Sequence, residues 1–465
     1  MVEASKKHFI QNLAAAFLAQ GVAFALSFIT SLIVPKLLGV AEFGYWQLFL
    51  FYITYVGFFH LGLNDGVYLI NGGKTRREID KADILSQFIA GTIVQTCIAV
   101  VAVVLSVAFL TGNQRTFVII CSAIYMVVHN AAGYLGYVFQ ALNETKLYSF
   151  SCVVNRLTFL CHLIALLALK CTMFEPYVLA YCVSEVAALL YCCLHATFLF
   201  KERPKKAAVC LRSVMVSMRC GIKLMIANVA SSLILGIVRF AVDYSWGIET
   251  FGELSFALSL VNFFLVFVSQ VSMVLFPALR KIQHDKLNCI FVQGQCLLGG
   301  ILPWAFVLYF PICHILSLWL PQYQNSLYYF ALLLPICLFD GKMNLLGMTF
   351  MKVLRKEQLL LRINLVAVVA SGVLVLLNLA FIHSIELMIL GVVLVIVARS
   401  IVSETLVRNS LGMPFSKNAI WECLIVATFI AIIYLDIAWP GIVALTVLCS
   451  CGLFSNAVSF RQSKA

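Results

Sequence analysis

Several charged residues interrupt long apolar stretches of this 465-residue chain, where a charge is costly unless it has a function or a partner. The cations are Arg156, Arg239 and Lys342, and the acids are Asp65, Glu185, Asp243 and Asp340. A guanidinium or an ammonium in such a place can bind phosphate oxygens, arginine two at a time. A carboxylate there can take up and release a proton or hold a cation. These residue types predict an anionic substrate bound by the cations and an ion, H+ or Na+, coupled through the acids.

Arg156 is the strongest candidate for a substrate contact. It lies about ten residues beyond Lys146, hence roughly 15 Å along a helix at 1.5 Å per residue, close to the middle of a membrane. The alternative is a structural hydrogen-bond network with Asn155 or a neighbouring helix.

Arg239 and Asp243 stand four residues apart, so they share one helix face and could pair with each other as readily as guide a substrate.

The other candidates have structural alternatives too. Asp340 and Lys342 follow Pro335, and a proline with a glycine close behind it predicts a kink where either residue could contact substrate or carry an ion. Asp65 and Glu185 could each couple an ion or neutralise an arginine. Lone histidines on apolar helices are expected to be packing residues. In this chain they are His60, His129, His162 and His195.

Composition assigns the chain to a membrane. Hydrophobic residues make up 63% of it and charged residues 11%, with a mean hydropathy of +1.01. Soluble domains are nearer 45 to 50% apolar. The sequence therefore predicts an all-α polytopic membrane protein. We interpret the net charge of +12 as a sign of how the chain is oriented in the membrane, and not as a sign of nucleic-acid binding.

The apolar residues divide into about fourteen stretches, each near the length of about 20 residues that a helix needs to cross the hydrocarbon core. They run over 9–34, 45–70, 84–111, 116–141, 148–169, 176–200, 221–242, 253–279, 288–316, 326–351, 358–382, 386–404, 419–437 and 440–459. The first is too long for the core of a signal peptide, so we expect it to be retained.

Lysine and arginine are unequally divided between the two sides. With alternate breaks assigned to the cytosol, about 26 of the 32 lie there, Arg399 among them, while Lys36, Arg115, Lys170 and Arg239 lie at or near the other side. Cytosolic loops of membrane proteins carry such an excess of basic residues. Both termini are predicted to be cytosolic, in the cytoplasmic (inner) membrane of a bacterium.

No enzyme site can be assembled from the sequence. The 17 cysteines have no disulfide-framework or zinc spacing and are expected to be packing residues. There is no Ser-His-Asp set, nucleotide-binding glycine loop or metal cluster. The predicted outward breaks are short, whereas membrane polysaccharide polymerases and ligases carry a large outward loop. We expect no catalytic residues, no metal and no cofactor.

Two short patterns recur at nearly the same offset. Gly39-x-x-x-Phe43-Gly44 returns as Gly247-x-x-x-Phe251-Gly252, 208 residues later. Gly136-x-x-Phe139 likewise returns as Gly347-x-x-Phe350, 211 residues later. With six spans between the copies, the pattern predicts a parallel repeat about an axis along the membrane normal, an arrangement typical of transporters.

The repeat sets the expected domains. Residues 1–200 form an N-lobe of six spans, 201–220 a basic cytosolic linker, 221–418 a C-lobe of six spans, and 419–465 two further spans with a cytosolic tail. The linker is expected to be an amphipathic surface helix drawn to anionic lipid.

The stretch PKLLGVAEFGYWQLFLFYITYVGFFHLGLNDGVYLI, residues 35–70, resembles the N-terminal signature of the oligosaccharide and polysaccharide flippases of the Wzx type. ILSLWLPQYQNSLYYFALLLP, residues 315–335, is similar to that family's loop before its tenth span. His60, Asn64, Asp65 and Pro321 depart from the family pattern. The family belongs to the MATE-like MOP exporter superfamily, so the resemblance implies a V-shaped, two-lobed fold that moves lipid-linked sugars from the cytosolic to the outer leaflet.

The expected function is a flippase for undecaprenyl-pyrophosphate-linked oligosaccharide repeat units, working by alternating access in O-antigen or other polysaccharide biosynthesis. Arg156, Arg239 and Lys342 are the predicted substrate contacts, and Asp65, Glu185, Asp243 and Asp340 the candidates for ion coupling. Expected partners are the lipid-linked oligosaccharide, membrane lipids and the polysaccharide polymerase and chain-length machinery. The alternatives are a MATE-type drug or cation exporter, against which the cations within the spans argue, and a membrane-embedded polymerase or ligase.

Overall fold

The computed structural model describes residues 25–109, 112–279, 284–414 and 418–462, which form helices joined by turns with no strand among them. The expected all-α fold is thereby confirmed. The chain divides into two compact units, Met1–Val229 and Ala230–Ala465. Most of the first expected span, 9–34, lies outside the described residues.

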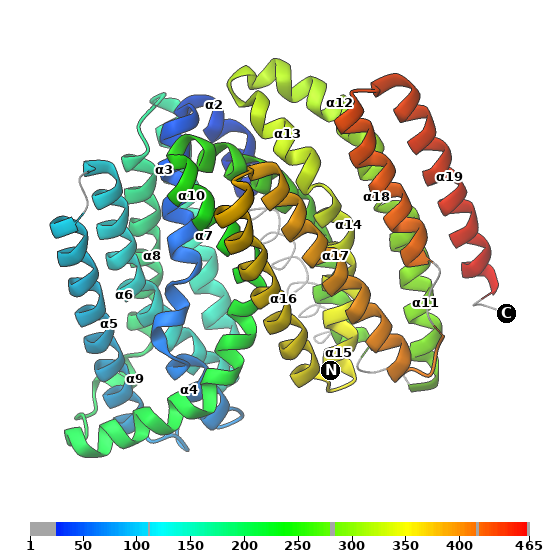
Figure 1. Cartoon of the computed structure of the whole chain (residues 1–465). Helices are drawn as coiled ribbons and strands as arrows, with labels where there is room; N and C mark the ends of the chain where they lie inside the picture. The colour runs from blue at the N-terminus through cyan, green and yellow to red at the C-terminus, as the bar shows by residue number, and fades with distance from the viewer. Residues whose placement is uncertain (1–24, 110–111, 280–283, 415–417, 463–465) are drawn as a thin grey trace. The chain divides into compact units, whose positions relative to one another are not determined.

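Unit 1 holds the helices from the N-terminal side of the chain (Figure 1). They are η1 (Ile29–Ile33), α2 (Val34–Leu38), α3 (Val40–Thr54), η2 (Val56–His60), α4 (Leu63–Asn71), α5 (Lys81–Phe109), α6 (Asn113–Ala141), α7 (Thr145–Ala168), α8 (Glu175–His195), α9 (Thr197–Phe200) and the first part of α10 (Ala207–Leu279). Helix α6 packs against α5 on one side and α8 on another, and α8 packs against α7. The ring of Trp46 on α3 lies 6.1 Å from that of Phe159 and 5.9 Å from that of Tyr181, so aromatic side chains fill the centre of the unit.

Unit 2 holds the rest of α10 and the helices after it. They are α11 (His284–Ile301), α12 (Trp304–Trp319), η3 (Pro321–Tyr323), α13 (Gln324–Leu333), α14 (Pro335–Lys342), η4 (Met343–Met348), α15 (Thr349–Val353), α16 (Glu357–Leu377), η5 (Asn378–Ile382), α17 (Ile385–Ser410), α18 (Asn418–Leu435) and α19 (Ala438–Gln462). Helix α17 packs against α14 and α16, and α19 packs against α11 and α18. In Figure 1, α11, α18 and α19 run side by side.

The helices have the length and composition of membrane spans. Among the described residues ten helices qualify, or up to twelve if each of two bent pairs counts as one span. Their outer faces carry exposed aliphatic side chains, such as Val107 at 63% and Val366 at 69% exposure, which lipid and not water would cover. The chain is a multi-pass membrane protein, and the expected count of fourteen is not confirmed. The seventh and eighth expected spans both lie in α10, which consists of two helical segments that meet at Gly247.

Two spans are bent where the sequence holds glycine or proline. The pair Pro321–Leu333 and Pro335–Val353 meets at 43°, which confirms the kink expected at Pro335. The pair Val40–His60 and Leu63–Asn71 meets at 54°, within the single span that the sequence predicts over 45–70. Leu61 and Gly62 both have positive φ, 50° and 80°, so the helical hydrogen-bond ladder stops between them.

The predicted repeat has a counterpart in the backbone. Gly39 has φ 71° and ψ 171°, and Gly247 has φ 84° and ψ −176°, a region open essentially to glycine alone. Each ends one helical segment and begins the next, and the following Phe43 and Phe251 are both fully buried. Each unit therefore has a helix break of the same backbone geometry, at Gly39 in unit 1 and at Gly247 in unit 2.

The second repeated pattern lies in the two cores. Phe139 belongs to the hydrophobic cluster of unit 1 and Phe350 to that of unit 2, and neither is exposed. Gly136 leaves room for the ring of Tyr148 on the next helix, and Gly347 leaves room for Ser403 on α17. A side chain at either glycine would push these neighbours apart, so the small residue is needed for close helix packing.

The beginning of α10 packs on unit 1 without intervening side chains. A Cβ atom at Gly66 would collide with the backbone of Ser217, and one at Gly221 would collide with the backbone of Gly62 and Gly66. Helix α4 and the first part of α10 are therefore in direct backbone contact. In Figure 1 this part of α10, in green, lies across the lower ends of the unit's other helices.

We expect Gly39→Ala and Gly247→Ala each to destabilise the protein by about 1 to 3 kcal/mol, because alanine is strained in this backbone region. Nothing lies within 4 Å of a Cβ at either position, so steric collision contributes nothing. Thermal unfolding of the purified protein in detergent measures the loss. The control is Gly112→Ala, which is equally open but has φ −108°; an equal loss in the control would contradict the explanation.

Candidate functional site

Arg156 lies halfway along helix α7, within a candidate membrane span, and its side chain is partly exposed. This position at mid-span agrees with the one expected from the sequence.

Glu185 of α8 is the centre of a polar cluster in unit 1. Its carboxylate accepts hydrogen bonds from Asn155 Nδ2 at 2.6 Å and from the Tyr125 hydroxyl at 3.3 Å. His129 Nδ1 lies 2.9 Å from Glu185 Oε1, so this nitrogen carries the hydrogen while the carboxylate is ionised. Glu185 is 7% exposed, whereas the His129 side chain is 43% exposed. The cluster joins a buried acid to a partly exposed base.

Asp65 lies directly after the break between η2 and α4. Its carboxylate is 2% exposed, and Oδ2 lies 3.8 Å from His60 Nε2. His60 Nδ1 accepts a hydrogen bond from the backbone N–H of Gly62 at 3.1 Å, which leaves the ring hydrogen on Nε2, toward Asp65. Positive φ at Leu61 and Gly62 turns the chain so that His60 and Asp65 face each other.

A polar cavity of about 190 Å³ is lined by Asp65 and by the histidines of both pairs, whereas Glu185 is not among its lining residues. Its lining includes His60, Asp65 and His129, with the amides of Asn64 and Asn130 between them. The two amides are held in place: Asn64 Nδ2 donates to the Asn130 carbonyl at 3.1 Å, and Asn130 Nδ2 donates to the Val56 carbonyl at 2.9 Å. The cavity has room and polar partners for water, which could carry a proton between His60 and His129.

Sequence reasoning treated His60 and His129 as packing residues, and the structure places both beside acids. Each histidine is distant from its acid in sequence or separated from it by the helix break, so helical spacing gave no sign of the pairing. The signal available was the presence of Asn64, Asp65 and Asn130 in otherwise apolar spans.

Arg239 lies on α10 in unit 2, where Nη2 donates a hydrogen bond to Ser255 Oγ at 3.1 Å. The guanidinium carbon also lies 5.0 Å from the ring centre of Phe251, a cation–π contact. Asp243 follows one turn later on the same helix and is 9% exposed. Both residues lie shortly before the Gly247 break, and the contacts to Arg239 come from the segment of α10 that follows the break.

Lys342 is enclosed in unit 2 between two carboxylates. Its ammonium lies 2.8 Å from Glu404 Oε2 on α17 and 2.7 Å from Glu422 Oε2 on α18. Lys342 is 3% exposed and Glu422 is 2% exposed. A substrate contact by Lys342 stays a prediction, and the geometry described here favours a structural role that ties α14 to α17 and α18.

Asp340, two residues earlier, pairs with Arg399 of α17. Arg399 is 7% exposed, and its second amino group lies 3.4 Å from Asn364 Oδ1 on α16. The expectation that Arg399 lies in a cytosolic break is wrong, because α17 continues without interruption to Ser410 and buries this arginine.

All three partners of Lys342 and Asp340 could have been found in the sequence. Arg399 and Glu404 interrupt the apolar run VVLVIVARSIVSETLV, and Glu422 interrupts AIWECLIVATF. Each is one charge in a long apolar segment, the same signal that singled out Lys342. The structure thus pairs Lys342 and Asp340 with three residues that were not among the predicted site residues.

The described residues contain no group of three or more histidine, cysteine or acidic side chains that could hold a metal ion. All 17 cysteines are free thiols in the structure. The predicted residues fall into two groups, with Asp65, Arg156 and Glu185 in unit 1 and Arg239, Asp243, Asp340 and Lys342 in unit 2.

We expect Lys342→Met to destabilise the protein by about 3 to 5 kcal/mol, because it leaves two buried carboxylates without their cation. Adding Glu422→Gln to Lys342→Met should restore part of that stability, since one uncompensated charge is removed. Thermal unfolding in detergent measures both effects, with the exposed Lys352→Met as the control. Unchanged stability of Lys342→Met, with loss of transport, would show instead that the ammonium serves the substrate.

The sequence and the fold were compared with those of known proteins. Over residues 9–283 the chain matches the family model described as "Polysaccharide biosynthesis protein". A search of curated proteins found no match.

Two solved structures resemble the fold. One is an inward-facing multidrug resistance MATE family transporter of the MOP superfamily, with a TM-score of 0.58, 12% identity, and coverage of 84% of this chain and 98% of that one. The other is the lipid II flippase MurJ in an inward closed conformation, with a TM-score of 0.59, 10% identity, and coverage of 95% of this chain and 99% of that one. At such identities the likeness concerns the fold.

The family match covers more than half of the chain, and the fold agrees with it. The family match includes residues 35–70, where the sequence resembles the flippases, whereas residues 315–335 lie outside it. The chain belongs to the polysaccharide biosynthesis protein family, within the fold group of the MOP transporters.

Proposed function

We propose that this protein is a flippase that moves undecaprenyl-pyrophosphate-linked oligosaccharide repeat units from the cytosolic to the outer leaflet by alternating access. The observation that carries the proposal is Arg156, a partly exposed guanidinium at the middle of a span in a protein of the polysaccharide biosynthesis family. A cation at that depth costs about 2.5 to 3.5 kcal/mol on insertion scales. An anionic pyrophosphate that has to cross the membrane is the ligand that such a cation would serve.

Arg239 is the second proposed substrate contact. Its guanidinium is fixed by Ser255 and by the ring of Phe251, so its position is set before a ligand arrives. A planar guanidinium retains its charge when partly desolvated and can bind two phosphate oxygens at once. Arginine at both sites therefore suits a pyrophosphate better than it suits a neutral sugar.

Energy for transport is proposed to come from an ion that binds at Asp65 and Glu185. Both carboxylates are nearly fully buried, and both have a histidine partner at the same polar cavity. A carboxylate in such a place changes its proton affinity when the cavity fills with water. The other acids proposed for coupling are Asp243 and Asp340, of which Asp340 already has Arg399 as a partner.

The same polar cavity favours the second candidate function, a MATE-type drug or cation exporter. An exporter of cations needs acidic and aromatic groups in its binding site, and Asp65 and Tyr137 both line this cavity. The two functions differ in the charge of the substrate, so their responses to loss of Arg156 differ.

We expect Arg156→Gln to lower flipping of the polyprenyl-linked oligosaccharide at least tenfold, because a neutral side chain cannot hold the pyrophosphate, and Arg156→Lys to retain part of the activity. Leaflet-resolved analysis of polyprenyl-linked glycans in cells that depend on the variant measures the accumulation on the cytosolic side. The matched control is Lys146→Gln, which removes the same charge from an exposed position on the same helix. Normal delivery by a folded Arg156→Gln protein would remove this arginine from the mechanism.

The exporter alternative is tested in the same cells. If depletion of the protein leaves glycan delivery to the outer leaflet normal and raises sensitivity to cationic dyes, the flippase proposal fails and the exporter is supported. Normal delivery with unpolymerised repeat units would support the polymerase reading.

We expect Glu185→Gln to uncouple transport from the proton gradient while the protein remains folded. The glutamine amide keeps an oxygen for Asn155 and Tyr125 but carries no charge for His129. Substrate-driven proton uptake in proteoliposomes measures the coupling, and Glu175→Gln, an acid at the start of the same helix, is the control. Unchanged proton uptake in Glu185→Gln would contradict the assignment.

A further inference from the structure

The first part of α10 is attached to unit 1 along one face. Ser213 Oγ donates a hydrogen bond to Asp83 at 2.7 Å, and Ser217 Oγ donates to Gln87 at 2.7 Å, both on α5. Cys210 and Val214 of the same face are buried in the hydrophobic cluster of the unit. This segment is therefore a fixed part of unit 1 and not a loose connection.

The opposite face of this segment is basic and flanked by apolar side chains. Arg212 and Arg219 are seven residues apart, hence on one side of the helix, and both are exposed. Beside them lie exposed large hydrophobic residues, with Leu211 at 59%, Met215 at 51% and Val216 at 53% exposure. A helix with this pattern lies in the interface between water and lipid, where its cations meet anionic headgroups.

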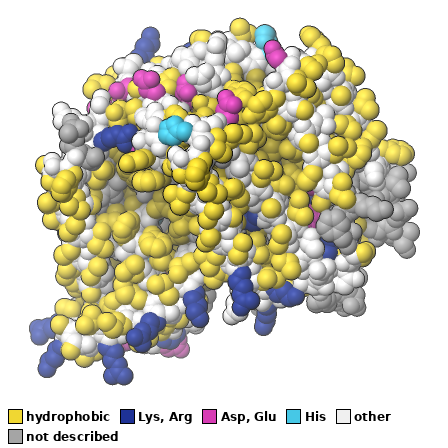
Figure 2. Space-filling view, in the orientation of Figure 1, with side chains coloured by type: hydrophobic (Ala, Val, Ile, Leu, Met, Phe, Trp, Pro, Cys, Tyr) yellow, Lys and Arg dark blue, Asp and Glu magenta, His cyan; other side chains and the backbone are white. Residues whose placement is uncertain are grey.

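The two arginines have no acidic partner among the residues that the structure describes, whereas a nearby lysine does. Lys205 Nζ lies 2.5 Å from Asp80 Oδ2 and 3.4 Å from Asp83 Oδ1. These acids raise the pKa of Lys205, and Lys205 in turn lowers the pKa of Asp80, so this pair is satisfied within the protein. The uncompensated positive charge therefore lies at Arg212 and Arg219. In Figure 2 lysine and arginine side chains gather along the lower edge, where α10 begins in Figure 1.

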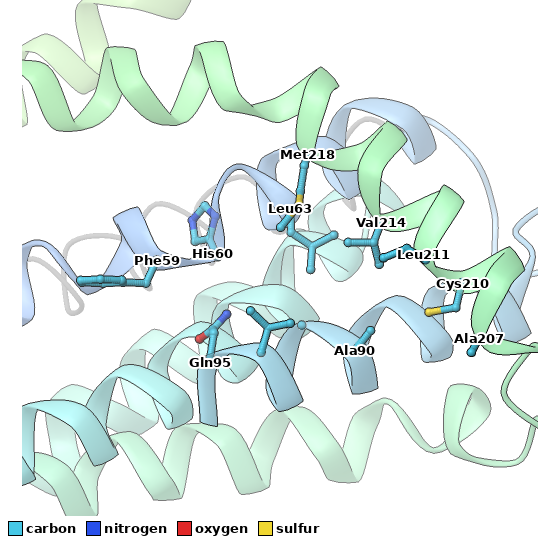
Figure 3. A pocket seen from close by; sticks show the side chains of 12 residues that line it. Phe59, His60, Leu63, Ala90, Gln95, Ala207, Cys210, Leu211, Val214 and Met218 are labelled. Atoms are coloured by element: carbon cyan, nitrogen blue, oxygen red, sulfur yellow. The ribbon is translucent and has the colours of Figure 1, made fainter. Parts of the chain in front are cut away.

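An apolar cavity of about 290 Å³ lies between this segment, α5 and the broken span (Figure 3). Its walls include Leu63, Ala90, Val94, Leu211 and Val214. The polar lining residues, His60 and Gln95, lie with Phe59 at the end away from Ala207, as Figure 3 shows. The volume is roughly twice that of a 150 Å³ cavity that holds benzene, so it takes on the order of a dozen carbon atoms.

The lining of the cavity continues onto surface that lipid would cover. Val94 is 45% exposed and its neighbour Ile93 58%, both on the outer side of α5, and Leu211 is exposed on α10. A hydrocarbon chain can therefore enter from the bilayer, whereas a polar ligand would lose its hydration and find nothing but the distant His60 and Gln95.

We propose that this cavity and the exposed arginines form a binding site for one acidic phospholipid. Arg212 and Arg219 hold the anionic headgroup, and one acyl chain lies in the cavity alongside Ala90 and Val94. The cavity volume suits part of an unbranched acyl chain; a polyprenyl chain is branched and several times longer. The site lies in unit 1 and does not depend on the substrate that the protein transports.

Native mass spectrometry of the full-length protein in detergent tests the site, with added phosphatidylglycerol or phosphatidylcholine of the same chain length. We expect the wild type to retain phosphatidylglycerol at least tenfold more strongly than phosphatidylcholine. The double variant Arg212→Gln/Arg219→Gln should lose about tenfold to thirtyfold in affinity for phosphatidylglycerol alone, at about tenfold or less per cation. The control Lys352→Gln/Arg355→Gln removes two exposed charges from unit 2 and should change nothing.

The cavity is tested separately by Ala207→Trp, at an exposed position where a large side chain can enter the cavity without displacing the core. This variant should weaken binding of both phospholipids and leave the melting temperature within a few degrees of the wild type. Three outcomes would overturn the proposal. They are equal retention of the two phospholipids by the wild type, unchanged retention in both variants, and, when polyprenyl phosphate is added together with phosphatidylglycerol, selective retention of the polyprenyl phosphate. Because no transport is measured, failure here leaves the proposed flippase function standing.

Discussion

The structure depends on one constraint, that a charge inside the membrane must be matched within the protein. Burial of apolar surface cannot hold helix to helix in lipid, since lipid tails are as apolar as leucine, so polar contacts and close packing have to do so. In unit 2 Lys342 joins α14 to Glu404 on α17 and Glu422 on α18. The pair of Asp340 and Arg399 adds a second link between the proline-bent span and α17. These ion pairs determine which helices of the unit lie next to one another.

Unit 1 meets the same constraint with hydrogen bonds and histidine. Glu185 has Asn155, Tyr125 and His129 as partners, and Asp65 faces His60 across a break in the helix. A histidine can in general release or accept a proton near neutral pH, whereas a lysine or an arginine keeps its charge. The two units therefore hold their buried acids differently, with lysine and arginine in unit 2 and with histidine, asparagine and tyrosine in unit 1.

The fold was largely readable from the sequence, because its signals are local. Apolar length gave the spans, Pro335 gave the bend after it, and the spacing of Gly39 and Gly247 gave the repeat that the backbone angles then reproduce. The candidate site was only half readable. A lone charge in an apolar run marks a position, and Arg156, Lys342 and Glu185 were found in this way. Which residue faces it depends on helix packing, so neither the enclosure of Lys342 by two glutamates nor the pairing of Arg399 followed from any spacing.

The direct backbone contact at Gly62, Gly66 and Gly221 has a mechanical consequence. Where side chains separate two helices, rotamer changes let the helices slide past each other by small steps. Here no side chains lie between the two helices at the contact, so α4 and the beginning of α10 move together as one rigid body. A movement of the chain segment that leads from unit 1 into unit 2 would therefore also move the broken span. The distance between His60 and Asp65 would change with it.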